Sequence, residues 1–115
     1  MSTYFSDSEI RCPHCKVNGM QPQFLNKLNQ FREKWDSPLI LTSAYRCEAH
    51  NTAIGGATNS MHLKGQAVDI SWLTMPGSEK AALLKLALSG FTGIGLHKQF
   101  LHVDDRPGGP LLWFY

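Results

Sequence analysis

The sequence contains no run of about 20 apolar residues of the kind that a membrane-spanning helix needs. Its first residues lack a basic leader followed by an apolar stretch, so no secretory signal is visible and we expect synthesis in the cytoplasm. No internal repeat, low-complexity stretch or linker divides the chain. These absences predict one domain over residues 1–115, with residues 1–20 as an N-terminal arm, and no membrane partner.

Cysteine is scarce, and the number of cysteines is odd. Cys12, Cys15 and Cys47 cannot form a framework of disulfides alone without leaving one thiol unpaired. Cys12-x-x-Cys15 together with Cys47-x-x-His50 has the ligand count of a structural zinc site. Two alternatives stay open: a disulfide between Cys47 and one N-terminal cysteine in an oxidising space, or three ordinary buried thiols.

The chain also has little excess of positive over negative charge. The formal net charge is +2, which is compatible with approach to an anionic polymer such as a cell wall. Only Arg11, Lys16 and Arg46 lie close in sequence to the cysteine and histidine positions, and they cannot form the basic face that nucleic-acid binding requires. We therefore expect no nucleic-acid partner, and we expect a monomer.

Helical periodicity predicts two helices. One begins at Pro22 and ends before Pro38, because a proline disfavours helical geometry at the residue that precedes it. The other is expected to be capped by Ser78 and to end at Gly90. Its predicted apolar stripe consists of Ala81, Leu84 and Leu88, reinforced by Leu83 and Ala87.

Short strands account for most of the remaining apolar segments. They are predicted over residues 39–42, 66–71, 91–96, 100–104 and 111–115. Alternation places Asp69 on the strand face opposite Val68, and His102 points away from the core in the same way. The aromatic residues Trp72, Trp113, Phe114 and Tyr115 are interpreted mainly as core or edge packing, with a groove-lining role for some of them as the alternative. The pattern predicts an α+β domain whose small antiparallel sheet presents Asp69 and His102 on one face, with helices packed on the other.

Three residues have the chemistry of a catalytic metal site. His62 and Asp69 are seven positions apart, and His102 lies near the C-terminus. Two imidazoles and one carboxylate are a common ligand set for zinc in hydrolases, where the open position is left for water. The spacing of His62 and Asp69 alone is equally compatible with a loop histidine and a surface aspartate that bind no metal.

The residues around this set carry a specific resemblance. The segments SAYRCEAHNTAIGGATNSMHLKGQAVDI and FLHVDDR resemble the D-alanyl-D-alanine peptidase family of zinc enzymes, which includes carboxypeptidases, dipeptidases and small phage endolysins. The S-x-H-x-x-G-x-A-x-D core of that family is present as Ser60, His62, Gly65, Ala67 and Asp69. The similarity runs over most of the chain and implies the fold and metal site shared by hedgehog domains and D-Ala-D-Ala peptidases.

The resemblance also implies roles for individual residues. His62, Asp69 and His102 match the three ligands of the Zn²⁺ cofactor. Arg46, in the segment SAYR, matches an arginine that binds substrate and stabilises the carbonyl oxygen as it becomes negative.

The general base departs from the family pattern. Some relatives carry a carboxylate three residues before the last ligand, where this chain has Gln99, and an amide cannot accept and return a proton. His97 matches a histidine found near the metal in part of the family, and we expect it to assist proton transfer. Asp104 is the alternative base, although an orienting role toward His102 suits it better.

These observations predict a zinc metallopeptidase that hydrolyses a D-alanine-containing amide bond in peptidoglycan stem peptides. The resemblance to small lytic enzymes implies a phage endolysin, or an enzyme of the phage particle, that reaches the cell wall after holin-type release or with the virion. Because of Gln99, the alternative is an inactive relative that serves as a zinc-stabilised wall- or protein-binding module.

Overall fold

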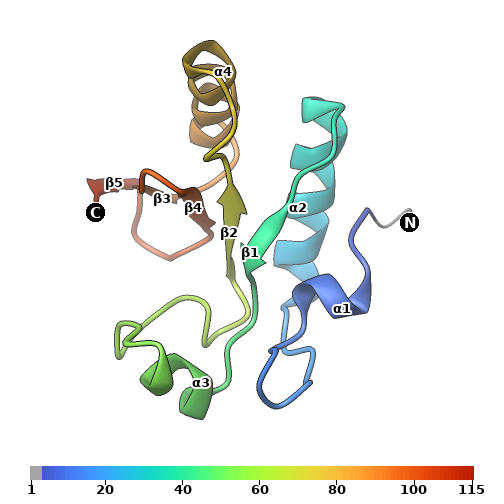
Figure 1. Ribbon diagram of the computed structural model, residues 1–115, viewed down its shortest axis with the longest axis vertical. Coiled ribbons are helices and arrows are strands. Elements are labelled where there is room, and N and C mark those ends of the chain that lie inside the picture. Colours follow the sequence, from blue (N-terminus) through green and yellow to red (C-terminus); the bar gives the residue numbers. More distant parts are fainter. Residues whose placement is uncertain (1–3) are drawn as a thin grey trace.

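Four helices and five short strands make up the secondary structure of residues 4–115, the part of the chain that the computed structural model describes (Figure 1). The elements are α1 (Asp7–Ile10), α2 (Pro22–Trp35), β1 (Leu41–Ser43), α3 (Glu48–Ala53), β2 (Ala67–Ser71), α4 (Gly77–Leu88), β3 (Gly93–Leu96), β4 (Phe100–Asp104) and β5 (Leu111–Phe114). Within these residues, none of the helices has the length and apolar character that crossing a bilayer requires.

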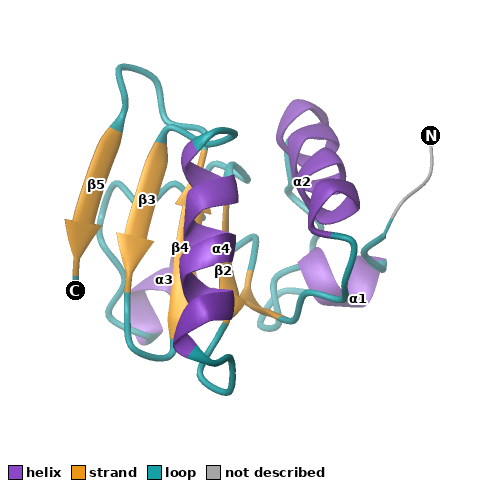
Figure 2. Cartoon of the chain, turned by 90° about the horizontal axis from the view of Figure 1, so that it is seen from above, coloured by secondary structure: helices purple, strands orange, loops and turns teal. Residues whose placement is uncertain are grey.

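The five strands form one sheet in the order β1-β2-β4-β3-β5. Neighbouring strands are antiparallel except for β3 and β5, which are parallel. The predicted antiparallel α+β architecture is confirmed, and the parallel edge is an addition to it. It arises because the chain after β4 passes the end of β3 and then turns back, so β5 lies on the far side of β3 and runs in the same direction as β3 (Figure 2).

The hydrophobic core lies between one face of the sheet and the helices α2 and α4. Val68 and Ile70 of β2 pair with Val103 and Leu101 of β4, and all four side chains are fully buried. Because side chains alternate along a strand, the residues between them face the opposite side of the sheet. The helices contribute buried residues to the same core: Phe24, Leu28 and Phe31 from α2, and Leu83 and Ala87 from α4.

The first predicted helix is confirmed, and the second differs in detail. Helix α2 begins at Pro22 and ends at a left-handed Asp36 with φ of 58°. The prediction that Ser78 caps the second helix is wrong, because Pro76 occupies the cap position and Ser78 lies in the first turn. The predicted stripe is also wrong at both ends, because Ala81 is exposed and Leu88 is 53 % exposed. Since α4 buries Leu83 and Ala87, its core-facing side is rotated away from Leu88.

The first strand is shorter than the apolar run that predicted it. Leu39 is buried, but Ile40 is 70 % exposed and β1 begins only at Leu41. Strand β1 lies at the edge of the sheet and pairs only with β2. An edge strand needs fewer buried positions than the fully buried strand that the sequence predicted.

Candidate active site

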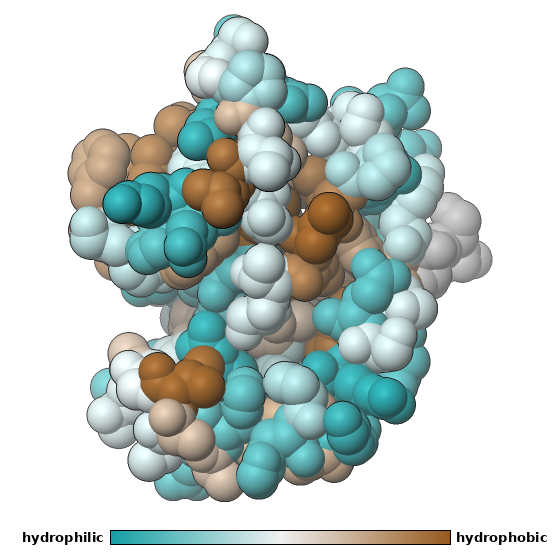
Figure 3. Space-filling view, in the orientation of Figure 1, coloured by the Kyte–Doolittle hydropathy of each residue, from teal (hydrophilic) through white to brown (hydrophobic). Residues whose placement is uncertain are grey.

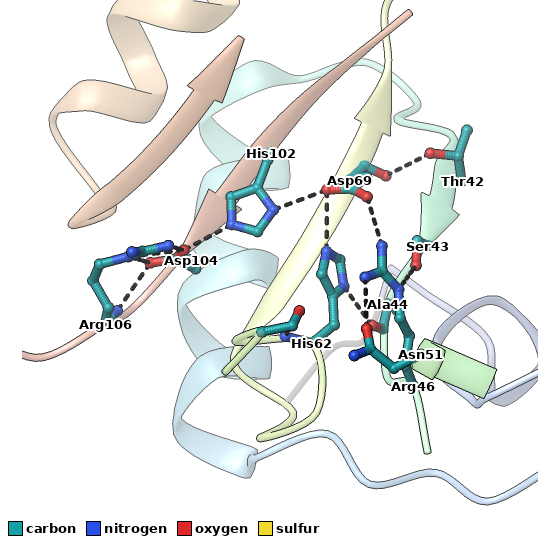
Figure 4. A network of polar contacts seen from close by, with 11 residues as sticks. Thr42, Ser43, Ala44, Arg46, Asn51, His62, Asp69, His102, Asp104 and Arg106 are labelled. Atoms are coloured by element: carbon teal, nitrogen blue, oxygen red, sulfur yellow. Dashed lines mark hydrogen bonds and ion pairs between the residues drawn. The ribbon is translucent and has the colours of Figure 1, made fainter. Parts of the chain in front are cut away.

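The two central strands carry two of the three residues predicted to bind a metal. Asp69 of β2 lies directly opposite His102 of β4, so both side chains leave the same face of the sheet. His62 comes from the loop between α3 and β2. One ligating atom from each residue lies within 4.8 Å of the other two, and none of the three residues is more than 5 % exposed (Figure 4).

The loop that carries His62 is fixed by its backbone. The His62 N–H donates to Ser60 Oγ at 3.2 Å, and the Arg46 N–H donates to the His62 carbonyl, also at 3.2 Å. Gly65 has a φ of +69°, and a Cβ there would meet the carbonyl oxygen of Gly19 at 2.0 Å. The glycine of the motif is therefore needed both for its backbone conformation and for its close approach to the N-terminal arm.

Each imidazole is oriented by a partner on its far side. His62 Nδ1 donates to the Ala44 carbonyl oxygen at 2.7 Å, and His102 Nε2 donates to Asp104 Oδ2 at 2.7 Å. In the neutral rings, the opposite nitrogens then carry lone pairs. These nitrogens, His62 Nε2 and His102 Nδ1, lie 3.2 and 2.9 Å from Asp69 Oδ1. Three acceptors thus converge, which is the arrangement that a divalent metal ion with a His/His/carboxylate ligand set requires.

The charges around this centre favour a cation as well. Burial raises the pKa of Asp69, but when the facing nitrogens of His102 and His62 carry protons, their hydrogen bonds outweigh this effect and hold that pKa well below its usual range. Burial also raises the pKa of Asp104, whereas hydrogen bonds from His102 and Arg106 lower it to about 2. Both carboxylates are therefore anionic at neutral pH.

Arg46 is held beside the centre by three hydrogen bonds. Its guanidinium donates to Ser43 Oγ at 3.0 Å, Asn51 Oδ1 at 3.2 Å and Asp69 Oδ2 at 3.3 Å (Figure 4). Burial lowers the pKa of Arg46, and the charge of Asp69 opposes this effect. Asn51 is itself fixed, because its Nδ2 donates to the Ala57 carbonyl at 2.9 Å. The sequence interpretation did not identify Asn51, although it follows the arginine by only five positions.

A cleft of about 450 Å³ opens above the three converging residues. In the space-filling view, the surface is hollowed between the sheet edge that carries β5 and the loop after α3 (Figure 3). One wall is the loop over residues 54–61, and the other is formed by aromatic residues of β4 and the C-terminal segment. The lining includes Arg46, His62, Asp69 and His102, together with Phe100, Arg106, Trp113 and Tyr115.

For Trp113 and Tyr115 the alternative holds, because both line this cleft. The ring of Trp113 lies 5.2 Å from that of His102, and the Arg106 guanidinium lies 4.7 Å above the Trp113 ring. Trp113 lies over Gly95, where a Cβ would come within 2.6 Å of the indole. The alternation pattern could not reveal this placement, because it depends on β5 joining the sheet beside β3.

His97 lies next to the cleft wall and is not among the residues that line the cleft. Its ring stacks on Phe100 with centroids 4.4 Å apart, and the Tyr115 ring lies 5.4 Å away. The Gln99 N–H donates to His97 Nδ1 at 3.0 Å. The catalytic role of His97 stays a prediction, and the other residue considered for it, Asp104, is fully occupied by His102 and Arg106.

The cysteines form a second cluster. Ligating atoms of Cys12, Cys15 and Cys47 lie within 4.8 Å of one another. His50, the fourth predicted ligand, is not part of this group, although its N–H donates to Cys47 Sγ at 3.5 Å.

A buried His/Asp/His set at the floor of an open cleft, with a fixed arginine beside it, defines a site of the metallopeptidase class. The comparison with protein families agrees with the geometry, because the family model described as Peptidase M15 matches residues 3–104. The chain belongs to the peptidase M15 family, which confirms the resemblance to D-alanyl-D-alanine peptidases. A comparison with curated proteins found no match.

Proposed function

We propose that this protein is a zinc peptidase that hydrolyses a D-alanine-containing amide bond in the peptide stems of peptidoglycan. The observation that carries the proposal is the convergence of His62, Asp69 and His102 beneath an open cleft in a chain of the peptidase M15 family. The phage setting, in which the enzyme acts after holin-type release or as part of the particle, rests on the resemblance to small endolysins.

His62 Nε2, Asp69 Oδ1 and His102 Nδ1 would hold the zinc ion. When bound there, zinc supplies a Lewis acid that polarises a carbonyl and lowers the pKa of a water molecule toward neutrality. The protein itself orients the two histidine ligands. The Ala44 carbonyl and Asp104 hold the two imidazoles in the tautomers that direct their lone pairs to one point.

Arg46 provides fixed positive charge for the oxygen that becomes negative during hydrolysis. Its three hydrogen bonds hold the guanidinium in place before substrate arrives, so no reorganisation is needed as the charge develops. Donors arranged in this way contribute about 3–4 kcal/mol to stabilising the transition state. Asn51 and Ser43 take part by fixing the position of the arginine.

The walls of the cleft suit a short peptide that carries carboxylates. Its volume fits a ligand of a few amino-acid residues. Trp113 and Tyr115 offer apolar surface on one side, while Arg46 and Arg106 place positive charge toward anionic groups of the stem. His97 would support proton transfer after rotation from its stacked position on Phe100, and this remains part of the proposal.

A catalytically inactive binding module of the same fold is the second candidate. It is favoured by Gln99, which stands where some relatives carry a catalytic carboxylate, and by the packing of His97 outside the cleft lining. In this case, the cleft would bind stem peptides or a protein segment without cleaving them.

Digestion of purified peptidoglycan distinguishes the two candidates. We expect the zinc-loaded protein to release peptides with new termini at a D-alanine bond, identified by mass spectrometry of the soluble products. Walls with direct cross-links and walls with bridged cross-links should both be used, because the products also show whether a terminal residue or a cross-link is cut.

The matched control is Arg46→Ala, which removes the guanidinium and leaves all three metal-binding residues in place. It should keep its zinc and release at least 100-fold less product. A fully metallated wild-type protein that cleaves neither wall type would contradict the peptidase and support the binding module.

A further inference from the structure

The second cluster joins two distant parts of the chain. Cys12 and Cys15 lie in the loop after α1, and Cys47 lies 35 residues beyond Cys12, immediately before α3. Cys12 Sγ and Cys47 Sγ are 3.6 Å apart, and all three thiols are free. This separation is too long for a disulfide, whose sulfurs lie about 2.05 Å apart, and is close to the sulfur–sulfur spacing around a tetrahedral metal.

The loop is folded so that its two thiols face the same point. The Lys16 N–H donates to the Cys12 carbonyl at 2.9 Å, and the Cys12 N–H donates to the Val17 carbonyl at 2.9 Å. Lys16, directly after Cys15, takes a left-handed conformation with φ of 64°, which is unfavourable for a residue with a side chain. The chain accepts this conformation in the turn that places Cys15 beside Cys12.

Backbone amides point at the sulfurs. The Cys47 N–H lies 3.4 Å from Cys12 Sγ, and the His50 N–H lies 3.5 Å from Cys47 Sγ. Burial raises the pKa of Cys12, but amide groups directed at its sulfur, among them that of Cys47, lower it to about 7. Hydrogen bonds of this kind stabilise thiolates, which are the form that binds metal.

Two imidazoles flank the three thiols. The rings of His14 and His50 are stacked with centroids 6.3 Å apart. His50 is half-buried on α3, three residues after Cys47, whereas His14 is exposed in the loop between the first two cysteines. The helix therefore holds His50 one turn from a thiol, and His50 is the better fourth ligand. Its ring nitrogens lie outside the group that the three sulfurs form, so metal binding would require a change of its side-chain rotamer.

We propose that Cys12, Cys15, Cys47 and His50 bind a second, structural zinc ion. Three thiolates and one imidazole form a closed tetrahedral set, which suits a structural zinc and leaves no position for substrate. The ion would fasten the N-terminal loop to the segment in which Arg46 precedes Cys47 and Asn51 follows His50. Metal binding at this site does not depend on the proposed peptidase activity.

Metal content and cobalt spectra of the full chain test the proposal. We expect wild-type protein, purified under reducing conditions, to contain two zinc ions per chain. After exchange with cobalt(II), it should show an intense thiolate-to-metal charge-transfer band. Cys15→Ser, which changes an exposed thiol, should bind one ion and lose at least nine-tenths of this band.

The two histidines provide a matched pair. His50→Ala should weaken zinc binding at the cysteine cluster at least tenfold, while His14→Ala should leave it unchanged. The converse variant, His62→Ala, should keep the charge-transfer band, which separates this site from the proposed catalytic one. A wild-type protein with no such band, a Cys12–Cys47 disulfide in the reduced preparation, or a loss caused by His14→Ala alone would overturn the assignment.

Discussion

Asp69 connects the parts of the candidate active site. One carboxylate oxygen lies within about 3.2 Å of both imidazoles, and the other accepts a hydrogen bond from Arg46. A single residue therefore links the proposed metal ligands to the guanidinium that faces the cleft. Changes at its neighbours should consequently separate metal binding from catalysis.

Replacement of Arg46 by lysine should lower kcat on stem peptides about 100-fold while zinc content stays unchanged. Lysine keeps the charge, but its ammonium group cannot bond to Ser43, Asn51 and Asp69 in the planar geometry that the guanidinium uses. Steady-state kinetics together with metal analysis check this expectation. Wild-type kcat in the lysine variant would show that charge alone is sufficient.

Asp104→Ala should weaken zinc binding at the active site by about 10- to 100-fold, because His102 loses the partner that orients its ring. Competition with a chromophoric chelator measures this affinity. Asp105→Ala is the control, since its carboxylate pairs with Lys27 at the surface and does not contact the site. Equal affinities in the two variants would contradict an orienting role for Asp104.

At the scale of elements, the turn before β2 determines where His62 lies. Gly65→Ala should destabilise the fold by about 2–4 kcal/mol, because it combines a left-handed backbone with a clash against Gly19. Gly55→Ala shares the positive φ but has no atom within 4 Å of the new Cβ, so it should cost only about 1 kcal/mol. Urea unfolding of both variants measures the difference in the free energy of unfolding. Equal losses of stability would show that the close approach of Gly65 to Gly19 does not contribute.

The sequence predicted the elements that have strong periodicity or a specific motif. Helix α2, the strands carrying Asp69 and His102, and the three converging residues belong to this group. Periodicity and motifs could not place Asn51 and Trp113 at the site, because both positions depend on tertiary structure. Asn51 reaches Arg46 through the packing of α3, and Trp113 reaches the cleft through the pairing of β5 with β3. The error at Ser78 arose because a proline two residues earlier took the cap position.

At the scale of the whole molecule, the residues proposed to bind metal join segments that are far apart in the chain. The active-site set connects β2, β4 and the loop before β2, all on the side of the sheet opposite the core. A ligand that binds only the folded state stabilises it by mass action, by about 2.7 kcal/mol at 100 times its Kd. Metal removal should therefore destabilise the entire domain.

Chelation of the Cys15→Ser variant isolates the contribution of the active-site metal to stability. We expect its Tm to fall by on the order of 10 °C on metal removal and to recover when zinc is added back. A His62→Ala, Cys15→Ser double variant should show no such response. If the single and double variants responded equally to chelation, the stabilising metal would have to lie elsewhere.

The most direct test of the central claim is an anomalous-difference map, collected at the zinc absorption edge from crystals of the wild-type protein. The account predicts a peak about 2.0–2.2 Å from His62 Nε2, Asp69 Oδ1 and His102 Nδ1. The absence of a peak among these three atoms in protein saturated with zinc, or a fourth protein ligand that closes the coordination sphere, would contradict a hydrolytic metal centre.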